Sequence, residues 1–288
     1  MQWSRAPAKI NLTLRVVGSR ADGYHELESL IAFAGLCDWL GFEPGDDLSL
    51  EVVGPRASDA GPVDGNLVLR AARLLAKHIP GLRLGRFRLI KRLPVAAGLG
   101  GGSADAAAAL RLLAAEAGLP LSDPRVHASA SATGADVAAC LSPQARIISG
   151  VGDKLGPTIQ LPNIFAVLVN PKIHAPTPKV FAAFDLAPPS SGASRARPLP
   201  AEWSHAPAVL DFLSLSRNDL EAAATRVAPA IAIVLERLSK IPEACVTGMS
   251  GSGATCFALF SDRRKAATAR RTLATEYPGW WVEASDLH

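Results

Sequence analysis

The chain has 288 residues, of which 49% are hydrophobic and 19% are charged, and its net charge is +4. This composition excludes a disordered chain and gives enough apolar material for one large domain or two medium ones. No apolar run approaches the roughly 18 residues of a membrane span, and the N-terminus lacks the apolar core of a signal peptide. We therefore expect a cytoplasmic protein with no membrane partner. Its basic residues are dispersed apart from short clusters such as "RRKAATARR", and this mild surplus by itself decides little about partners. We expect no nucleic-acid partner. The four cysteines have no C-x-x-C pair and are expected to be buried, reduced thiols: Cys37, Cys140, Cys245 and Cys256.

In the first half, alternating apolar residues predict strands at 8–17, 48–53 and 84–91, and helical spacing predicts a helix at 65–79. The alanine-rich stretch 103–118 predicts the strongest helix, with Ser103 as its N-cap and Gly118 after its end. Residues 123–141 predict a short helix, a glycine break and a second apolar piece.

After residue 160 a strand is expected at 164–170 and a helix from 177 to 184, followed by a loop rich in Pro, Ser and Ala at 186–208. Helix at 218–240, a strand–glycine turn–strand at 244–260 and a closing helix at 263–277 complete the chain. This mixed order predicts an α+β fold of two domains, 1–157 and 158–288.

The stretch "LPVAAGLGGGSADAAAAL", residues 93–110, has four glycines within five positions just before a predicted helix. Backbone N–H groups at a helix start have no partner inside the helix, and with the positive end of the helix dipole they can bind an anion such as a triphosphate. No lysine follows the glycines, which excludes a Walker A loop. Ser103 occupies the last glycine position of the Rossmann pattern, which argues against that loop too.

Three ordered motifs carry a family resemblance: "APAKINL" near the N-terminus, "P-x-x-x-G-L-G-G-G-S-x-D-A-A" in the middle and "TGMSGSGATCFALF" near the C-terminus. Together they resemble the GHMP kinases, which phosphorylate small molecules with ATP. The resemblance implies an N-terminal ATP-binding domain, a C-terminal ferredoxin-like substrate domain and a site in the cleft between them. It also implies Mg²⁺ as the companion of ATP.

Within the superfamily, "RADGYHELESL", "TGADV" and "SRNDLE" resemble the 4-diphosphocytidyl-2-C-methyl-D-erythritol kinases. This implies ATP-dependent phosphorylation of the 2-hydroxyl of a cytidine-diphosphate-linked sugar alcohol in the non-mevalonate isoprenoid pathway. Two alternatives remain at this point: a mevalonate or phosphomevalonate kinase, and a non-catalytic relative that binds nucleic acid. A monomer or weak homodimer is expected.

The resemblance assigns residues by position. Asp136 would accept the hydroxyl proton as general base, and Lys9 would keep Asp136 ionised and stabilise developing charge. Outside the motif context, Lys9 would be read as a surface lysine and Asp136 as a helix cap. Residues that would bind ATP are Pro94, Gly98, Leu99, Gly100, Gly101, Gly102 and Ser103, the last of which could give a hydroxyl to phosphate or magnesium.

Lys91 and Asn66 resemble positions on the adenine side of the nucleotide, although a strand-end lysine and a helix-capping asparagine would look the same. For the acceptor, Tyr24 and His25 would contact cytosine by stacking and hydrogen bonding. Asn11 would position the erythritol or its phosphates, and Thr177 and Phe181 would close over the base. The chain departs from the family pattern at Ala104, where a second serine is common. It also departs at Ile31, where some relatives have an aromatic residue, although Phe33 follows two residues later.

Overall fold

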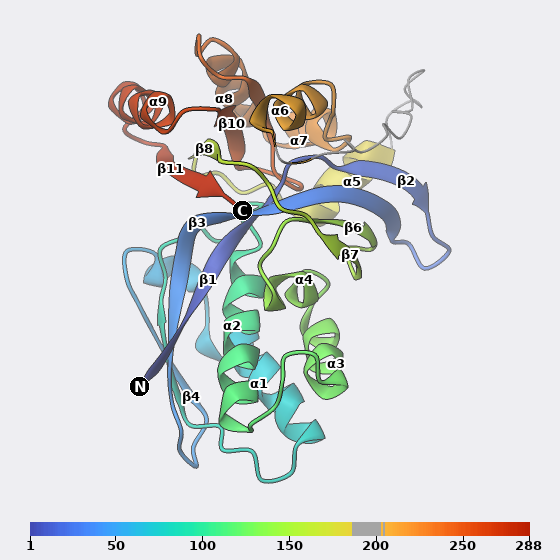
Figure 1. Cartoon of the computed structure of the whole chain (residues 1–288), viewed down its shortest axis with the longest axis vertical. Helices are drawn as coiled ribbons and strands as arrows, with labels where there is room; N and C mark the ends of the chain where they lie inside the picture. Colours follow the sequence, from blue (N-terminus) through green and yellow to red (C-terminus); the bar gives the residue numbers. More distant parts are fainter. Residues whose placement is uncertain (186–202, 204) are drawn as a thin grey trace. The chain divides into compact units, whose positions relative to one another are not determined.

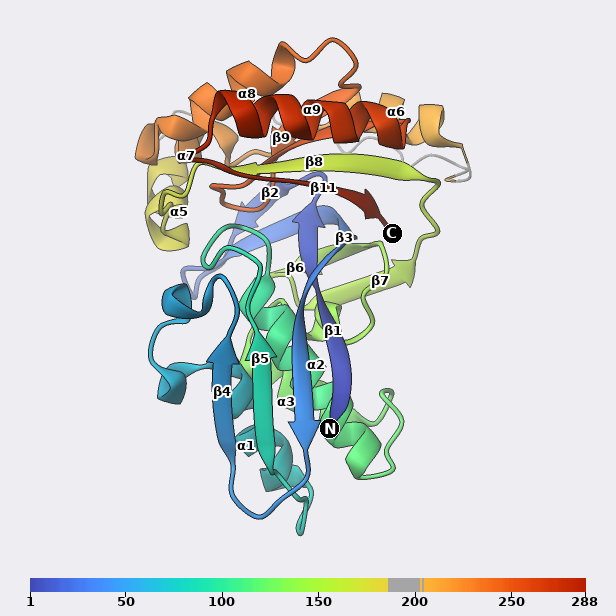
Figure 2. The same cartoon turned by 90° about the vertical axis from the view of Figure 1, so that its left-hand side faces the viewer.

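The computed structural model describes residues 1–185, 203 and 205–288, and the chain forms two compact units (Figures 1 and 2). The first unit comprises Met1–Lys9, Leu36–Val95 and Gly100–Pro143, and the second comprises Ile10–Gly35, Ala96–Leu99 and Gln144–His288. Each unit therefore contains several chain segments, whereas the sequence predicted one boundary between residues 157 and 158. Two strands, β1 and β3, begin in one unit and end in the other.

The first unit is a sheet with helices on one face. β4 (Ser49–Val53) pairs in parallel with β5 (Arg86–Ile90), β5 pairs antiparallel with β3 (His25–Glu43), and β1 (Gln2–Asn11) also pairs with β3. Figure 2 shows these strands side by side, with helices behind them. The helical segments are η1 (Ala57–Ala60), η2 (Val63–Gly65), α1 (Leu67–His78), α2 (Gly101–Glu116), α3 (Pro124–Thr133) and α4 (Val137–Leu141).

Helix α2 lies at the centre of this unit and contacts α1, α3 and α4. Alanine favours helix because its side chain loses no rotamer freedom, and its small size lets neighbouring helices approach closely. Six alanines of α2 are fully buried: Ala104, Ala106 to Ala109 and Ala114. The alanine-rich motif thus explains both the helix and its tight packing.

The second unit contains a four-stranded antiparallel sheet in the order β11–β8–β10–β9. These strands are β8 (Ile164–Asn170), β9 (Val246–Met249), β10 (Cys256–Phe260) and β11 (Trp281–Leu287). The helices are α5 (Thr177–Asp185), α6 (Ala206–Ser214), α7 (Glu221–Val227), α8 (Ala230–Ser239) and α9 (Arg263–Glu276). Figures 1 and 2 both show α8 and α9 on the same side of this sheet. One strand, helices, two strands, a helix and a last strand make the expected ferredoxin-like arrangement.

Leu287 of β11 pairs antiparallel with Ala34 of β3, and the sheet continues there into further antiparallel strands. These are β2 (Arg15–Ser19), the N-terminal half of β3, β6 (Arg146–Gly150) and β7 (Lys154–Thr158). No helix within the described residues is long and apolar enough to cross a bilayer.

Most expected elements are confirmed, and five details are corrected. The predicted helix 218–240 is two helices, because α7 ends at Val227 and α8 starts at Ala230. The predicted strand 8–17 is two strands, because β1 ends at Asn11 and β2 starts at Arg15. Ser103 does not cap α2, which starts two residues earlier behind Gly100. Cys245 is exposed, whereas the other three cysteines are buried as expected. Of the loop predicted at 186–208, residues 186–202 and 204 lie outside the described residues, and α6 already starts at Ala206.

Candidate active site

Lys9 and Asp136 lie together in the first unit. The Lys9 Nζ is 3.1 Å from the Asp136 Oδ1, and the Lys9 side chain is only 6% exposed while that of Asp136 is 34% exposed. Lys9 is therefore no surface lysine. Asp136 directly precedes α4, yet its side chain makes no capping hydrogen bond. This geometry holds one carboxylate oxygen against an ammonium group and leaves the carboxylate accessible, as a general base needs.

The glycine turn lies beside this pair. Gly100 has a φ of 60°, in the left-handed region that only glycine enters without strain. A Cβ on Gly100 would lie 3.2 Å from the Cβ and Cε of Lys9 and 3.9 Å from the Asp136 Oδ2. The turn, the start of α2 and the Lys9–Asp136 pair therefore form one site. Glycine is required here by close packing on Lys9 as well as by the backbone angle.

In the second unit, Ser250 connects the three motifs. Its Oγ accepts a hydrogen bond from the Asn11 N–H at 3.1 Å and donates to the carbonyl of Gly98 at 2.8 Å. A Cβ on Gly98 would come within 2.5 Å of the Ser250 carbonyl oxygen, so no larger residue fits. The third motif thus fixes the first motif and the entry to the glycine turn through a fully buried serine.

Lys91 is buried under the start of α2. Its Nζ donates to the Asp38 Oδ2 and to the Asp105 Oδ2, each at 2.6 Å. Burial would lower the pKa of Lys91, but the two carboxylates outweigh it and raise that pKa. Burial, reinforced by the like charge of Asp38, raises the pKa of Asp105 to about 7 although Lys91 opposes this. The prediction that Lys91 lines the adenine side of the nucleotide stays a prediction.

Asn66 caps α1, because its Oδ1 accepts a hydrogen bond from the Val68 N–H at 3.0 Å. This is the capping role that the sequence left open, and a part for Asn66 in binding adenine stays a prediction. Pro94 and Leu99 are buried, whereas Gly102 is exposed and Ser103 is half-buried in the first turn of α2.

The residues expected at the base come together in the second unit. The His25 ring stacks on Phe181, with centroids 4.8 Å apart and planes 24° apart. The His25 Nε2 lies 2.7 Å from the Asp185 Oδ1, a partner that the sequence did not suggest. Tyr24 is 65% exposed, so its ring is free to contact a ligand. The structure therefore brings an aromatic pair and an accessible tyrosine ring to one region of this unit.

Asn11 and Thr177 are each held by hydrogen bonds. The Asn11 Nδ2 donates to the Ser29 Oγ at 2.7 Å, and the Thr177 and Ser252 hydroxyls lie 2.8 Å apart. The departures from the family pattern are buried: Ala104, Ile31 and Phe33 are each 0% exposed. Ile31 and Phe33 are thus core residues in this chain.

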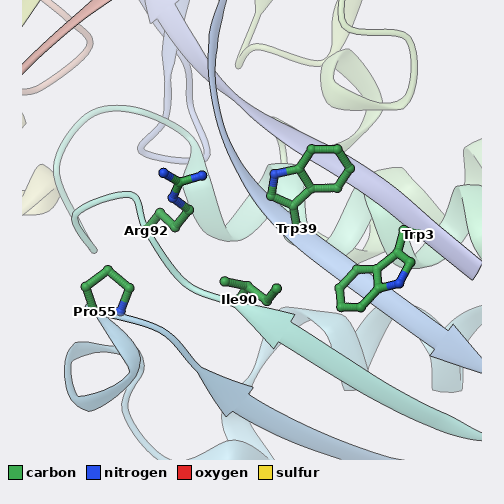
Figure 3. A pocket seen from close by; sticks show the side chains of 5 residues that line it. All are labelled: Trp3, Trp39, Pro55, Ile90 and Arg92. Atoms are coloured by element: carbon green, nitrogen blue, oxygen red, sulfur yellow. The ribbon is translucent and has the colours of Figure 1, made fainter. Parts of the chain in front are cut away.

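A pocket on the outer face of the first unit's sheet contains none of these residues (Figure 3). It is lined by Trp3, Trp39, Pro55, Ile90 and Arg92. Its walls are apolar apart from the guanidinium group of Arg92. The pocket therefore has no carboxylate or ammonium group that could take part in phosphoryl transfer.

Four side chains that contact predicted site residues were not singled out from the sequence: Asp38, Asp105, Ser250 and Asp185. Asp105 and Ser250 stand inside quoted motifs, as the D of "GGGSADAA" and the first serine after "TGM", and could have been singled out as polar residues in small, apolar surroundings. Asp38 lies in an unremarkable stretch of β3 and Asp185 at the end of α5, and no local signal marks either of them.

Known proteins that are similar to this chain are GHMP kinases. A family model described as the GHMP kinases N terminal domain matches residues 66–144, and one described as GHMP kinases C terminal matches residues 206–279. A curated 4-diphosphocytidyl-2-C-methyl-D-erythritol kinase of Xanthobacter autotrophicus is 56% identical over 99% of this chain and 98% of the relative. One from Methylorubrum extorquens is 53% identical with the same coverage. A crystal structure of 4-(cytidine 5'-diphospho)-2C-methyl-D-erythritol kinase is 34% identical with a TM-score of 0.80, covering 99% of both chains.

The fold, the glycine turn and the Lys9–Asp136 pair define a small-molecule kinase of the GHMP type, as the motifs indicated. Within that class, the chain belongs to the 4-diphosphocytidyl-2-C-methyl-D-erythritol kinase family, since its similarity to those kinases extends over their full length.

Proposed function

We propose that this protein transfers the γ-phosphoryl group of ATP to the 2-hydroxyl of 4-diphosphocytidyl-2-C-methyl-D-erythritol, in the non-mevalonate route to isoprenoid precursors. The observation that carries the proposal is the identity of 56% to a kinase of that name over 99% of this chain. The retained contact between Lys9 and Asp136 supports catalysis rather than binding alone.

In the proposed reaction, the oxygen of the substrate 2-hydroxyl attacks the γ-phosphorus of ATP, and Asp136 accepts the proton of that hydroxyl. The bond from that phosphorus to the β,γ-bridging oxygen breaks, and ADP leaves. Lys9 holds the Asp136 Oδ1 at 3.1 Å and thereby orients the carboxylate. Its positive charge also stabilises negative charge that develops on the transferred group.

The phosphates of ATP are assigned to the turn Gly98–Gly102 and to the first turn of α2. N–H groups at the start of α2 have no acceptor within the helix, and the helix dipole adds positive potential there. Mg²⁺ prefers oxygen ligands and takes most of them from phosphates and water. The half-buried Ser103 hydroxyl fits that requirement as a single protein oxygen, and the bound ion would neutralise charge on the phosphates.

The cytosine is assigned to Tyr24, His25 and Phe181, whose rings provide stacking surfaces and one imidazole edge for hydrogen bonding. Asn11 and Thr177 are assigned to the erythritol diphosphate part of the substrate. Both offer short polar side chains that the structure already holds in place.

The test is ADP release by the purified protein with ATP, Mg²⁺ and either diphosphocytidyl-methylerythritol or mevalonate. We expect turnover with the cytidylated substrate alone. His25→Ala should raise the KM for that substrate by about tenfold or more, because a buried polar contact to the base is lost, and should leave the KM for ATP nearly unchanged.

Two results would contradict the proposal. If the protein phosphorylates mevalonate or phosphomevalonate but not the cytidylated substrate, it is a different GHMP kinase. Salt-dependent RNA binding without any ADP release would make it a non-catalytic relative. That the protein is a monomer or a weak homodimer stays a prediction. Sedimentation velocity of the same preparation measures its oligomeric state.

A further inference from the structure

Three charged side chains form a closed cluster in the first unit: Asp38 of β3, Lys91 just after β5 and Asp105 of α2. They are 0%, 3% and 2% exposed, respectively. Lys91 donates one hydrogen bond to each carboxylate, so it joins a strand of the sheet to the central helix. Burying three charges is costly unless they are paired, so this arrangement points to a specific task.

Asp38 holds the segment that leads into the glycine turn. Its Oδ1 accepts hydrogen bonds from the backbone N–H of Arg92 at 2.5 Å and of Leu93 at 2.9 Å. Those residues directly precede Pro94, the first residue of the glycine motif. One buried carboxylate thus fixes the chain as it leaves β5.

The cluster lies against the first residue of α2. A Cβ on Gly101 would be 3.3 Å from the Lys91 Nζ and 3.8 Å from the Asp38 Oδ2. Any shift of the cluster would therefore move the start of α2, whose N–H groups are assigned to the phosphates. The Oδ1 of Asp105 has no hydrogen-bond partner among the described residues, so Lys91 is what holds Asp105 in place.

We propose that Asp38, Lys91 and Asp105 are positioning residues for ATP. They support the glycine turn and the first turn of α2 from beneath, and so set the affinity for the phosphates without touching the nucleotide. This rests on the proposed function, because it takes the glycine turn as the phosphate site. It also assigns Lys91 a part different from direct contact with the adenine side.

The first experiment uses Asp38, which no motif assigns and which is 0% exposed. Asp38→Ala removes the acceptor of two N–H groups, and we expect its Kd for ATP to rise about tenfold or more, as for other losses of positioning. The KM for the cytidylated substrate and kcat at saturating ATP should stay within about threefold of wild type, because those depend on other residues. Asp38→Asn keeps a carbonyl oxygen for the two N–H groups but places its amide donor against the Lys91 Nζ, so its Kd for ATP should rise less than that of Asp38→Ala. Asp47→Ala, in an exposed turn of the same unit, is the matched control and should change nothing.

A second experiment separates indirect from direct action of Lys91. Lys91→Met alone buries two carboxylates without a cation and can unfold the protein, so it is combined with Asp105→Asn. The double variant retains only the carboxylate that two N–H groups already bind. Because the cluster supports the phosphate site, we expect the double variant to lose affinity for ATP by about tenfold or more and to keep its affinity for adenosine within about threefold of wild type. Wild-type affinity for ATP overturns this part, and so does an equal loss for adenosine, which means that Lys91 contacts the adenine side.

ATP affinity is measured by titration calorimetry without the acceptor, and folding by the thermal unfolding midpoint. Unchanged ATP affinity in a folded Asp38→Ala protein overturns the inference. So does an equal loss for ATP and for the cytidylated substrate, which indicates a general loss of structure. Wild-type protein that neither binds ATP nor releases ADP contradicts the proposed function instead.

Discussion

At the scale of single residues, the proposed chemistry rests on the contact between Lys9 and Asp136. Lys9 lies in the buried part of β1, and Asp136 directly precedes the short helix α4. Their side chains form an ion pair. Asp136 makes no capping bond, so its contact with Lys9 supports the catalytic role proposed for it rather than a structural one.

Asp136→Asn should lower kcat by about 100-fold or more, the usual effect of losing a general base. The Kd for ATP should change little, because the variant keeps the shape of the side chain. Steady-state ADP release and ATP titration measure the two quantities, with Asp47→Asn as the control at an exposed site. Unchanged turnover would remove Asp136 from the mechanism.

Ala96, which lies in the glycine motif, has a strained backbone, because its φ of 51° is in the left-handed region. A Cβ in that region costs about 1 kcal/mol, so Ala96→Gly should raise the free energy of unfolding by up to that amount despite the added chain entropy of glycine. Urea unfolding followed by circular dichroism measures the change. A loss of stability would mean that the Ala96 methyl group contributes packing that outweighs the strain.

At the scale of elements, local sequence explains the helices well. The alanines of α2 explain why that segment is helical. α3 starts at Pro124, and the preceding Asp123 caps it by accepting a hydrogen bond from the Arg125 N–H at 2.9 Å. The predicted N-cap of α2 was wrong because Gly100 in the left-handed region, rather than a hydroxyl, precedes the helix. The first N–H groups of α2 thus have no side-chain cap, as a phosphate site requires.

Asn66 allows capping to be separated from nucleotide binding. Asn66→Ala should destabilise the protein by about 1 kcal/mol through loss of the α1 cap, whereas Asn66→Ser should keep most of the stability. If Asn66 also contacts the adenine side of ATP, both variants will raise the KM for ATP equally. Denaturant unfolding and ATP kinetics on the same two variants distinguish these roles.

At the scale of the whole molecule, burial decides which side chains can react. Cys37, Cys140 and Cys256 are buried, and Cys245 is exposed. Burial, with the nearby Asp136 charge adding to it, raises the pKa of the Cys140 thiol to about 12. Burial likewise raises the pKa of Cys256. A thiol with a raised pKa stays protonated, and therefore unreactive, until the pH approaches that value.

The native protein should therefore react quickly with a thiol reagent at Cys245 alone, and at all four cysteines after denaturation. Raising the pH from 7 to 9 should not bring Cys140 into reaction, because both values lie far below its pKa. Mass spectrometry of the labelled protein counts the modified sites. Fast labelling of Cys140 in folded protein would contradict the burial described for α4.

The family, the α+β class, most helices and the residue types of the candidate site follow from short motifs and from periodicity along the chain. Which of those residues meet depends on the folded arrangement of distant segments. Lys9 contacts Asp136, Lys91 contacts Asp38, and Ser250 contacts Asn11 and Gly98, each across more than fifty residues of chain.

Strands β3, β6, β7 and β11 were likewise not predicted. Strand pairing is a contact between distant segments, and the central part of β3 is a continuous buried run without the alternation that marks a half-buried strand. A local pattern can show what a segment prefers, but the free energy of burial and pairing depends on partners that the segment itself does not specify.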